Sequence, residues 1–242
     1  MLPNEQSFPV EFIADNCRDF GLELDGQAKQ RLCLYSRLLI EWNQKINLTA
    51  ITEPAEIAEK HFLDSLMLLK FINIPQNARL IDVGTGAGFP GMVLKIARPD
   101  IKLTLVDSLN KRVTFLKELS AHLGLETEII HARAEELGSG PLYRDSFDIA
   151  TARAVAQLNV LCEYCLPFVK PGGSFLALKG PDPQEEVDGA RNAIKILSGG
   201  LSAIHSYVLP ASGGRTIVDI KKISQTPPKY PRVSAKILKK PL

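Results

Sequence analysis

Residues 80–91, with the sequence LIDVGTGAGFPG, constrain the fold of this chain more than any other segment. An apolar run leads to Asp82, and glycine then occupies every second position from Gly84 through Gly86 to Gly88. This pattern predicts a β-strand that turns tightly into the N-terminus of a helix. Backbone that carries no side chain can approach a small charged ligand closely at such a turn. The segment therefore predicts an α/β unit with a ligand site at its turn.

Two classes of ligand fit this turn. Read from Gly86, the segment satisfies the dinucleotide pattern G-x-G-x-x-G, and Asp107 follows about 20 residues later, where a ribose-binding carboxylate is expected. Read from Asp82, it is D-x-G-x-G-x-G, the first motif of S-adenosylmethionine (AdoMet) methyltransferases. A carboxylate beside the turn repels pyrophosphate but favours the ammonium and sulfonium groups of AdoMet. The sequence favours AdoMet, with a nicotinamide-dependent (NAD) oxidoreductase as the alternative.

Composition is that of a globular enzyme. The chain has 242 residues, of which 45% are hydrophobic and 23% are charged, so it can bury a large core in one domain with a small additional element. No apolar stretch reaches the ~18 residues of a membrane span, and acidic residues interrupt the N-terminal segment where a signal peptide would be apolar. Four cysteines then predict free thiols in a reducing compartment. We expect a cytoplasmic protein without a membrane partner, and a monomer.

Charge is distributed unevenly along the chain. Residues 221–242 contain seven of the 29 Lys and Arg residues and no acidic residue, which leaves 22 basic against 27 acidic residues elsewhere. Such a basic tail is suited to contacts with phosphates, and a merely solubilising tail is the alternative. Four prolines in this segment argue against an amphipathic helix there: Pro227, Pro228, Pro231 and Pro241.

Hydrophobic periodicity and composition divide the chain into an N-terminal helical cap (1–78), an alternating α/β segment (79–221) and a basic, proline-rich C-terminal tail (222–242). Because residues 79–221 contain the glycine turn, we expect them to form an AdoMet-dependent methyltransferase domain. Helices are expected at 8–20, 27–47, 54–71, 89–97, 111–123, near 135, 157–169 and 182–197. Strands are expected at 79–83, 103–107, 128–131, 148–152, 174–179, 203–208 and 216–221. This alternation predicts a Rossmann-like α/β fold, with a doubly wound, mostly parallel, seven-stranded sheet that ends in an antiparallel hairpin.

In such sheets, ligands bind beyond the carboxyl ends of the strands. Asp107 ends the second predicted strand, where its carboxylate can accept hydrogen bonds from ribose hydroxyls or cap the next helix. Ala134 and Glu135 follow the third strand, where backbone and one polar side chain can meet an adenine edge. Glu135 as an exposed carboxylate at a helix start is the alternative.

The end of the fourth strand, Thr151–Val155, indicates what the substrate is not. It lacks the [N/D]-P-P-[Y/F] motif with which methyltransferases hold exocyclic amines. No cysteine stands at this strand end or the next, which disfavours covalent chemistry at pyrimidine C5. Guanine N7 fits what remains, because its lone pair needs no general base and the rate depends mainly on alignment.

Four stretches together resemble the RsmG family of small-subunit ribosomal RNA methyltransferases, also called the glucose-inhibited division protein B family. They are residues 42–49 (WNQKINLT), 60–66 (KHFLDSL), 82–91 (DVGTGAGFPG) and 107–112 (DSLNKR). The resemblance implies a class I methyltransferase fold and transfer of a methyl group from AdoMet to N7 of G527 in the 530 loop of 16S rRNA. It implies 16S rRNA, in the 30S subunit or an assembly intermediate, as the partner. An RNA-binding assembly factor with a sensory AdoMet site is the alternative.

The resemblance also implies residue roles. It implies that Arg153 positions the cofactor carboxylate, with no general base and no metal. The cofactor-binding positions that follow are Asp82, Gly84, Gly86, Gly88, Phe89, Asp107, Ser108, Leu109, Ala134, Glu135 and Arg153. The basic positions implied at the mouth of the pocket for RNA are Lys111, Arg133, Lys179 and Arg215.

Several other motifs have mainly structural interpretations. Cys162 and Cys165 form a C-x-x-C motif in a helical stretch without further ligands at metal spacing, which predicts buried thiols. His61 and Asp64 lie one helical turn apart, and we expect them to satisfy each other or a backbone group. Trp42 is expected in the core.

Overall fold

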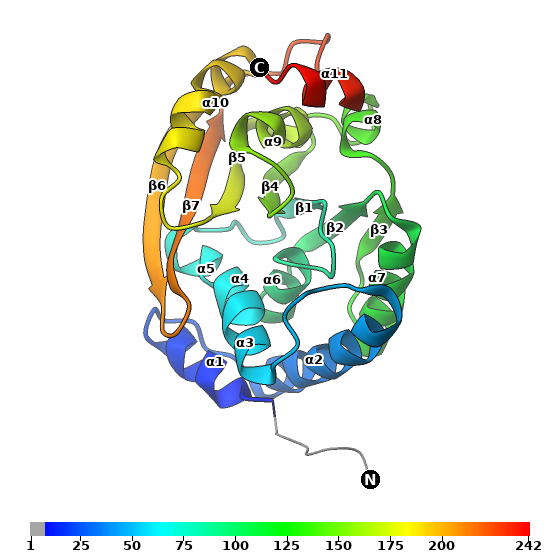
Figure 1. The fold of residues 1–242 in the computed structure, drawn as a ribbon, viewed down its shortest axis with the longest axis vertical. Coiled ribbons are helices and arrows are strands. Elements are labelled where there is room, and N and C mark those ends of the chain that lie inside the picture. Colours follow the sequence, from blue (N-terminus) through cyan, green and yellow to red (C-terminus); the bar gives the residue numbers. More distant parts are fainter. Residues whose placement is uncertain (1–7) are drawn as a thin grey trace.

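One seven-stranded sheet organises the computed structural model, which describes residues 8–242 (Figure 1). The strands are β1 (Arg79–Val83), β2 (Lys102–Asp107), β3 (Glu128–His131), β4 (Phe147–Arg153), β5 (Val169–Lys179), β6 (Gly199–Leu209) and β7 (Gly213–Lys222). Their order is β3-β2-β1-β4-β5-β7-β6. The first five pair in parallel, whereas β7 is antiparallel to both β5 and β6. The predicted sheet and its terminal hairpin are confirmed.

Helices cover both faces of the sheet (Figure 1). On one face lie α1 (Val10–Arg18), α2 (Gly26–Ile46), α3 (Pro54–Ile57), a π-helical turn (Ala58–Leu63), α4 (Asp64–Leu66), α5 (Leu68–Phe71), α6 (Gly91–Ala97) and α7 (Asn110–Leu123). On the other lie α8 (Ala134–Ser139), α9 (Leu158–Cys165), a 3-10 turn (Leu166–Phe168), α10 (Gln184–Ile196) and α11 (Ser234–Lys239). Among the described residues, no helix combines the length and apolar character needed to cross a membrane.

The N-terminal helices share a core with the sheet. Ile13 of α1 and Leu39 of α2 are fully buried in the same hydrophobic cluster as Leu80 of β1 and Leu176 of β5. Burial of each such side chain contributes on the order of 1.5–3 kcal/mol, so this helical layer is held by the hydrophobic effect. Its position also places several of its polar side chains against the glycine turn.

The predicted helix 54–71 is interrupted. A π-helical turn, Ala58–Leu63, separates α3 from α4, and Met67 separates α4 from α5. Wide turns of this kind are common at functional sites, and no periodicity in the sequence marks this one. It lies where the helix faces the carboxyl ends of the strands.

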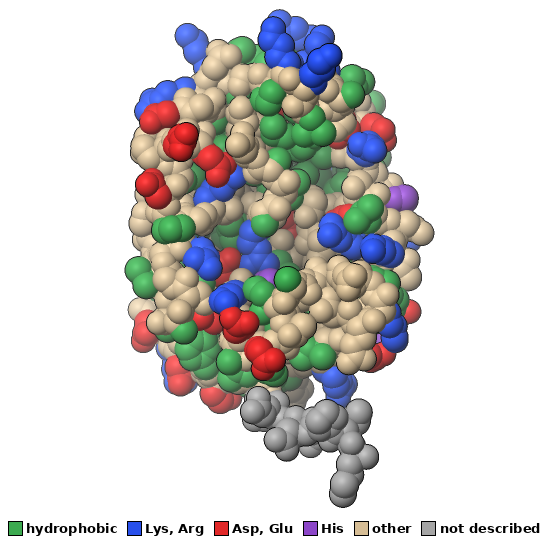
Figure 2. All heavy atoms as spheres, in the orientation of Figure 1, with side chains coloured by type: hydrophobic (Ala, Val, Ile, Leu, Met, Phe, Trp, Pro, Cys, Tyr) green, Lys and Arg blue, Asp and Glu red, His purple; other side chains and the backbone are tan. Residues whose placement is uncertain are grey.

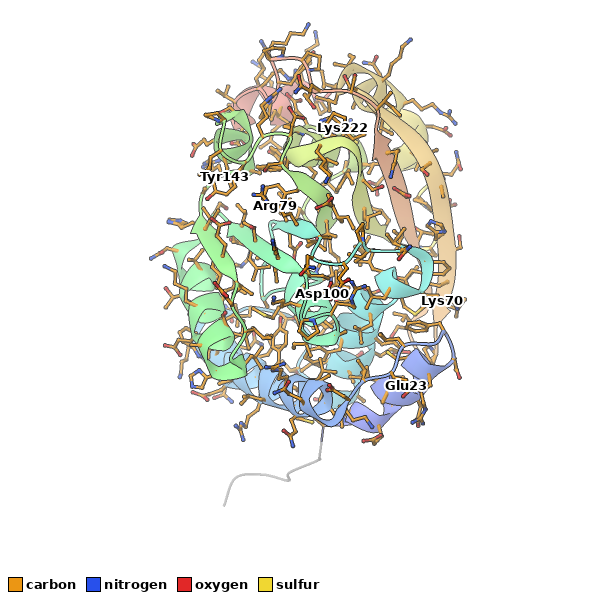
Figure 3. The ribbon with its side chains drawn as sticks, turned by 180° about the vertical axis from the view of Figure 1, so that it is seen from behind. Glu23, Lys70, Arg79, Asp100, Tyr143 and Lys222 are labelled. Atoms are coloured by element: carbon orange, nitrogen blue, oxygen red, sulfur yellow. The ribbon has the colours of Figure 1, made fainter. Side chains whose placement is uncertain are left out.

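The C-terminal segment differs from its prediction. A six-residue helix, α11, forms between Pro231 and Pro241 and buries Ile237, so the prolines bound a helix rather than exclude it. Lys222 is buried, and its Nζ donates to Thr226 Oγ1 at 2.6 Å and to Leu166 O at 2.5 Å. Figure 3 shows Lys222 at the end of the molecule where this segment lies. Not all of the expected basic tail is therefore available to phosphates.

Candidate functional site

The glycine turn leaves β1 at its carboxyl end and enters α6 at Gly91. Gly84 adopts φ +67°, and a Cβ there would lie 2.7 Å from the Val155 side chain, so only glycine fits without movement. A Cβ on Gly91 would lie 2.9 Å from Asp82 Oδ2. These two glycines allow the strand, the helix and the β4–α9 loop to approach one another.

Asp82 lies beneath the turn rather than in a cavity. Its side chain is fully buried, and its carboxylate accepts hydrogen bonds from Gly91 N at 2.9 Å, Thr85 Oγ1 at 2.6 Å and Thr151 Oγ1 at 3.1 Å. Burial raises the pKa of Asp82, and these three donors act in the opposite direction. Asp82, which was expected to bind the cofactor, therefore stabilises the glycine turn. Its carboxylate can act on a bound cation only through long-range electrostatic attraction.

A cavity of about 540 Å³ opens beside the turn. This main cavity is bounded by the N-terminal helical layer, the glycine turn and the ends of β4, β5 and β7. Figure 2 shows Lys and Arg side chains gathered around the middle of this face. The lining residues used below are Thr49, Lys60, His61, Asp64, Gly84, Gly86, Phe89, Arg112, Arg153, Lys179, Glu186 and Arg215.

Arg153, from the end of β4, is held by the π-helical turn and α4. Its Nη1 donates to Asp64 Oδ2 at 2.9 Å and to Lys60 O at 3.0 Å, and its guanidinium lies 5.0 Å from the Phe89 ring centre. Asp64 also accepts a hydrogen bond from Tyr207 at 2.7 Å. These contacts make Arg153 part of the wall of the cavity, and its predicted contact with the cofactor stays a prediction.

His61 completes this wall. Its ring stacks on Phe89 with centroids 4.6 Å apart, and its two nitrogens lie 2.8 Å from Thr49 Oγ1 and 3.3 Å from Arg153 Nη2. Burial, together with the positive charge of Arg153, lowers the pKa of His61 to about 3. His61 and Asp64 thus meet at Arg153, contrary to the expectation that they satisfy each other or a backbone group. A neutral imidazole here adds no positive charge to the cavity.

A second cavity of about 270 Å³ lies across Gly84 from the first. It is lined by the ends of β2 and β3, including Asp107, Ser108, Ala134 and Glu135. Gly84 lines both cavities, and the Val155 side chain stands over it at their junction. The predicted adenosine residues are therefore brought together, next to the cavity that Gly86 and Phe89 line.

Asp107 holds the start of α7, as the capping role predicts, while its binding of ribose hydroxyls stays a prediction. It is 2% exposed, and it accepts hydrogen bonds from Leu109 N and Gly86 N, both at 2.9 Å. It therefore fixes the turn before α7 and the glycine turn at once. Leu109 itself is 42% exposed and lines neither cavity, and Gly88 lies behind the turn against Tyr35.

The expected group of basic residues divides. Lys179 and Arg215 line the main cavity, Arg133 lines the second, and Lys111 is exposed and lines neither. Lys111 follows β2 and Arg133 follows β3, whereas Lys179 ends β5. All three lie at the carboxyl ends of the strands, but these strands are not neighbours of β5, so the residues do not line the same cavity. Lys179 and Arg215 therefore share the main cavity, whereas the role of Lys111 and Arg133 in binding RNA stays a prediction.

Several lining residues were not predicted as site residues. Lys60 and Asp64 come from the interrupted helix, and Thr49 comes from the loop before it. The His61–Asp64 spacing was a usable signal, but only the fold shows that it faces the end of β4. Glu186 gave no signal, because an acidic residue in the first turn of a helix is ordinary.

The thiols of the C-x-x-C motif are buried, as predicted. Cys162 and Cys165 are fully buried in α9, and burial raises the pKa of each thiol. Within residues 8–242, no cluster of three or more His, Cys, Asp or Glu side chains has the arrangement of a metal site.

The two cavities adjoin at Gly84, so together they can hold one elongated ligand. Arg112 Nε, on the wall of the main cavity, is buried without a hydrogen-bond partner among the described residues. A buried donor without a partner is costly, which favours a ligand carrying an acceptor there. Asp107 supplies carboxylate oxygens at the other cavity. Arg112 Nη1 lies 3.5 Å from Asp107 Oδ2, so this donor and this acceptor stand side by side where the two cavities adjoin. AdoMet carries groups that both can bind, a carboxylate for the guanidinium and ribose hydroxyls for the carboxylate.

Known methyltransferases share this architecture. An SAM-dependent methyltransferase from Aquifex aeolicus matches with a TM-score of 0.51 at 19% identity, over 72% of this chain and 96% of that structure. An SAM-dependent O-methyltransferase from Thermotoga maritima matches with a TM-score of 0.51 at 17% identity, over 78% and 73%. At these identities the likeness shows the fold.

Sequence comparison is more specific. The chain is 50% identical over 232 residues to ribosomal RNA small subunit methyltransferase G of Alkaliphilus metalliredigens, covering 95% of this chain and 97% of the relative. It is 53% identical over 226 residues to the protein of the same name from Desulforamulus reducens, covering 91% and 94%. The family model described as rRNA small subunit methyltransferase G matches residues 28–213. The chain therefore belongs to the rRNA small subunit methyltransferase G family.

Proposed function

We propose that this chain transfers the methyl group of AdoMet to N7 of a guanine, G527, in the 530 loop of 16S rRNA. The observation that carries the proposal is the pair of cavities that meet at Gly84, at the carboxyl ends of the strands of a methyltransferase fold. Membership of an rRNA methyltransferase family supports the class of substrate.

We assign the adenosine part of AdoMet to the second cavity and its amino-acid part to the main cavity. Asp107 would hold the ribose hydroxyls, and Ala134 with Glu135 would hold the adenine in the second cavity. Arg112 and the backbone of the glycine turn would hold the amino-acid end in the main cavity. The carboxylate of Asp82 lies beneath the turn, where its negative charge favours a cationic ligand.

The remaining volume of the main cavity would take the target base, between the ends of β4 and β5. AdoMet supplies an electrophilic methyl group on a sulfonium. Guanine N7 carries a lone pair and no proton, so these residues need only align it and exclude water. Arg153, His61 and Phe89 form a rigid wall for this purpose, and no group there has to remove a proton.

The basic side chains around the opening of the main cavity would bind the RNA. Arg215, near the start of β7, donates to the carbonyls of Ser212 and Gly214, which holds its side chain at the rim. Lys60 lines the same cavity from the π-helical turn. We take the substrate to be the 30S subunit or an assembly intermediate, bound by a monomer in the cytoplasm.

The decisive experiment is methyl transfer from labelled AdoMet to small-subunit particles from cells that lack this gene. The modified nucleotide is mapped in the product. We expect one 7-methylguanosine, at G527. AdoMet binding without transfer to these particles would instead favour the assembly factor with a sensory AdoMet site. Thermal protection by NAD but not by AdoMet would favour the oxidoreductase.

A further inference from the structure

The main cavity has a carboxylate at the end formed by β5 and α10. Glu186, in the first turn of α10, accepts hydrogen bonds at Oε2 from Leu158 N at 2.9 Å and from Lys179 Nζ at 2.6 Å. Lys179 Nζ also donates to Ala156 O at 2.9 Å. One oxygen of this carboxylate is thus fixed from two directions.

The other oxygen is not used by the protein. Glu186 Oε1 has no hydrogen-bond partner within residues 8–242, and the side chain lines the main cavity while 38% exposed. Both N–H groups that fix Glu186 converge on Oε2. The fixed side orients the carboxylate, and the free side offers an acceptor to whatever enters the cavity.

We propose that Glu186 selects the target base, by accepting hydrogen bonds from the Watson–Crick edge of guanine at Oε1. This inference rests on the proposed function. Guanine alone among the RNA bases carries two adjacent donors on that edge, N1–H and the 2-amino group, and a carboxylate accepts both. N7 lies on the opposite side of the purine, so a base held at that edge leaves N7 free to face the methyl donor.

The same arrangement rejects the other bases. Adenine presents a bare N1 acceptor where guanine presents N1–H, so its lone pair would face the carboxylate. A wrong partner at one such contact typically lowers the rate by about 10- to 100-fold. The base gains positive charge when N7 is alkylated, and a nearby carboxylate also stabilises that charge. Lys179 acts as the positioning residue for Glu186.

The test compares 16S rRNA, assembled into small-subunit particles, that carries guanosine or inosine at the target position. Inosine retains N7 and N1–H but lacks the 2-amino group. The wild-type full-length enzyme should prefer guanosine by about tenfold in kcat/KM. In Glu186→Gln the amide oxygen is drawn to Leu158 N and Lys179, which turns the NH2 group toward the donors of guanine. This variant should methylate guanosine at least about tenfold more slowly, with the guanosine-to-inosine ratio near one.

Glu185→Gln is the matched control, since Glu185 is the adjacent exposed residue of α10 and lies outside the cavity. It should keep the wild-type ratio. Glu186→Ala removes both oxygens and should also bring the ratio near one. AdoMet affinity and melting temperature, measured in parallel, identify variants that lose the fold rather than the contact.

The outcomes separate the two proposals. A wild-type enzyme that binds AdoMet but leaves guanine N7 unmodified overturns the proposed function, and this inference falls with it. A wild-type enzyme that methylates guanosine, with Glu186→Gln and Glu186→Ala folded and keeping the wild-type ratio, overturns the role of Glu186 alone.

Discussion

Gly84 is the residue on which both cavities depend. Its left-handed φ and the 2.7 Å approach of Val155 leave no space for a side chain. We predict that Gly84→Asp lowers AdoMet affinity by at least about tenfold, because the strain and clash displace the turn, and abolishes methyl transfer. RNA binding should largely remain. Isothermal titration and filter binding measure the two effects.

Gly189→Asp is the matched control, since Gly189 of α10 has open space around its Cα. This variant should retain AdoMet binding and activity. Equal loss of affinity in the two variants would show that the added charge, rather than the turn, causes the defect.

His61 gives the fold a sensitivity to acid. Its pKa is 6.5 in a model peptide and about 3 in the folded protein, so the unfolded chain takes up a proton first and acid favours unfolding. The resulting loss of stability is absent above pH 6.5. It grows by up to about 1.4 kcal/mol per pH unit as the pH falls from 6.5 toward 3.

We predict that between pH 6.5 and pH 5 the wild-type protein loses up to about 2 kcal/mol more stability than His61→Gln. Urea unfolding at several pH values measures the free energy of unfolding of both proteins. If both proteins lose the same free energy of unfolding over this pH range, the imidazole of His61 has an ordinary pKa in the folded protein and is not buried against Arg153.

At the scale of elements, the C-terminal segment is held by a buried ion pair. Arg232, just before α11, donates to Glu163 of α9 at 2.6 Å and 2.8 Å, and the Glu163 side chain is 1% exposed. We predict that Arg232→Ala destabilises the protein by about 3 kcal/mol, because it leaves a buried carboxylate without its cationic partner and with only the backbone N–H of residue 232 as a donor. Urea unfolding measures this change.

Lys229→Ala, at an exposed position of the same segment, should change the stability by less than about 0.5 kcal/mol. Adding Glu163→Gln to Arg232→Ala should restore part of the loss, because it removes the unpaired charge. If the double variant is no more stable than the single one, packing of α11 accounts for the effect.

Elements that depend on local pattern could be predicted from the sequence. The bounds of β1 and β3 match, because each strand is a short apolar run closed by a turn. The π-helical turn and α11 could not be predicted, since both are decided by tertiary contacts that local propensity does not encode. In the site, the residues that follow strands were identified, whereas those contributed by another element, such as Asp64 and Glu186, were not.

At the scale of the whole molecule, RNA binding should depend on cations at the mouth of the main cavity. We predict that Arg215→Ala weakens RNA binding and lowers the slope of log affinity against log salt concentration by about 0.7–0.9, because one phosphate contact is lost. Filter binding at several salt concentrations gives the slope.

Lys102→Ala is the control, because Lys102 begins β2 at the opposite edge of the sheet from the main cavity. Its slope should equal that of the wild type. An unchanged slope for Arg215→Ala, with activity reduced, would place Arg215 against the base rather than against a phosphate.

The position of Val155 over Gly84 has a consequence for the order of events in a catalytic cycle. A donor that spans both cavities would pass Val155, which lines the second cavity and lies one residue from Ala156 and three from Leu158. Those two backbone groups hold Lys179 and Glu186 in place. Because the donor and the base would both contact this short loop, we expect a seated donor to restrict its movement and a compulsory sequence in which AdoMet enters first and RNA second. In steady-state kinetics, S-adenosylhomocysteine should then compete with AdoMet and not with RNA.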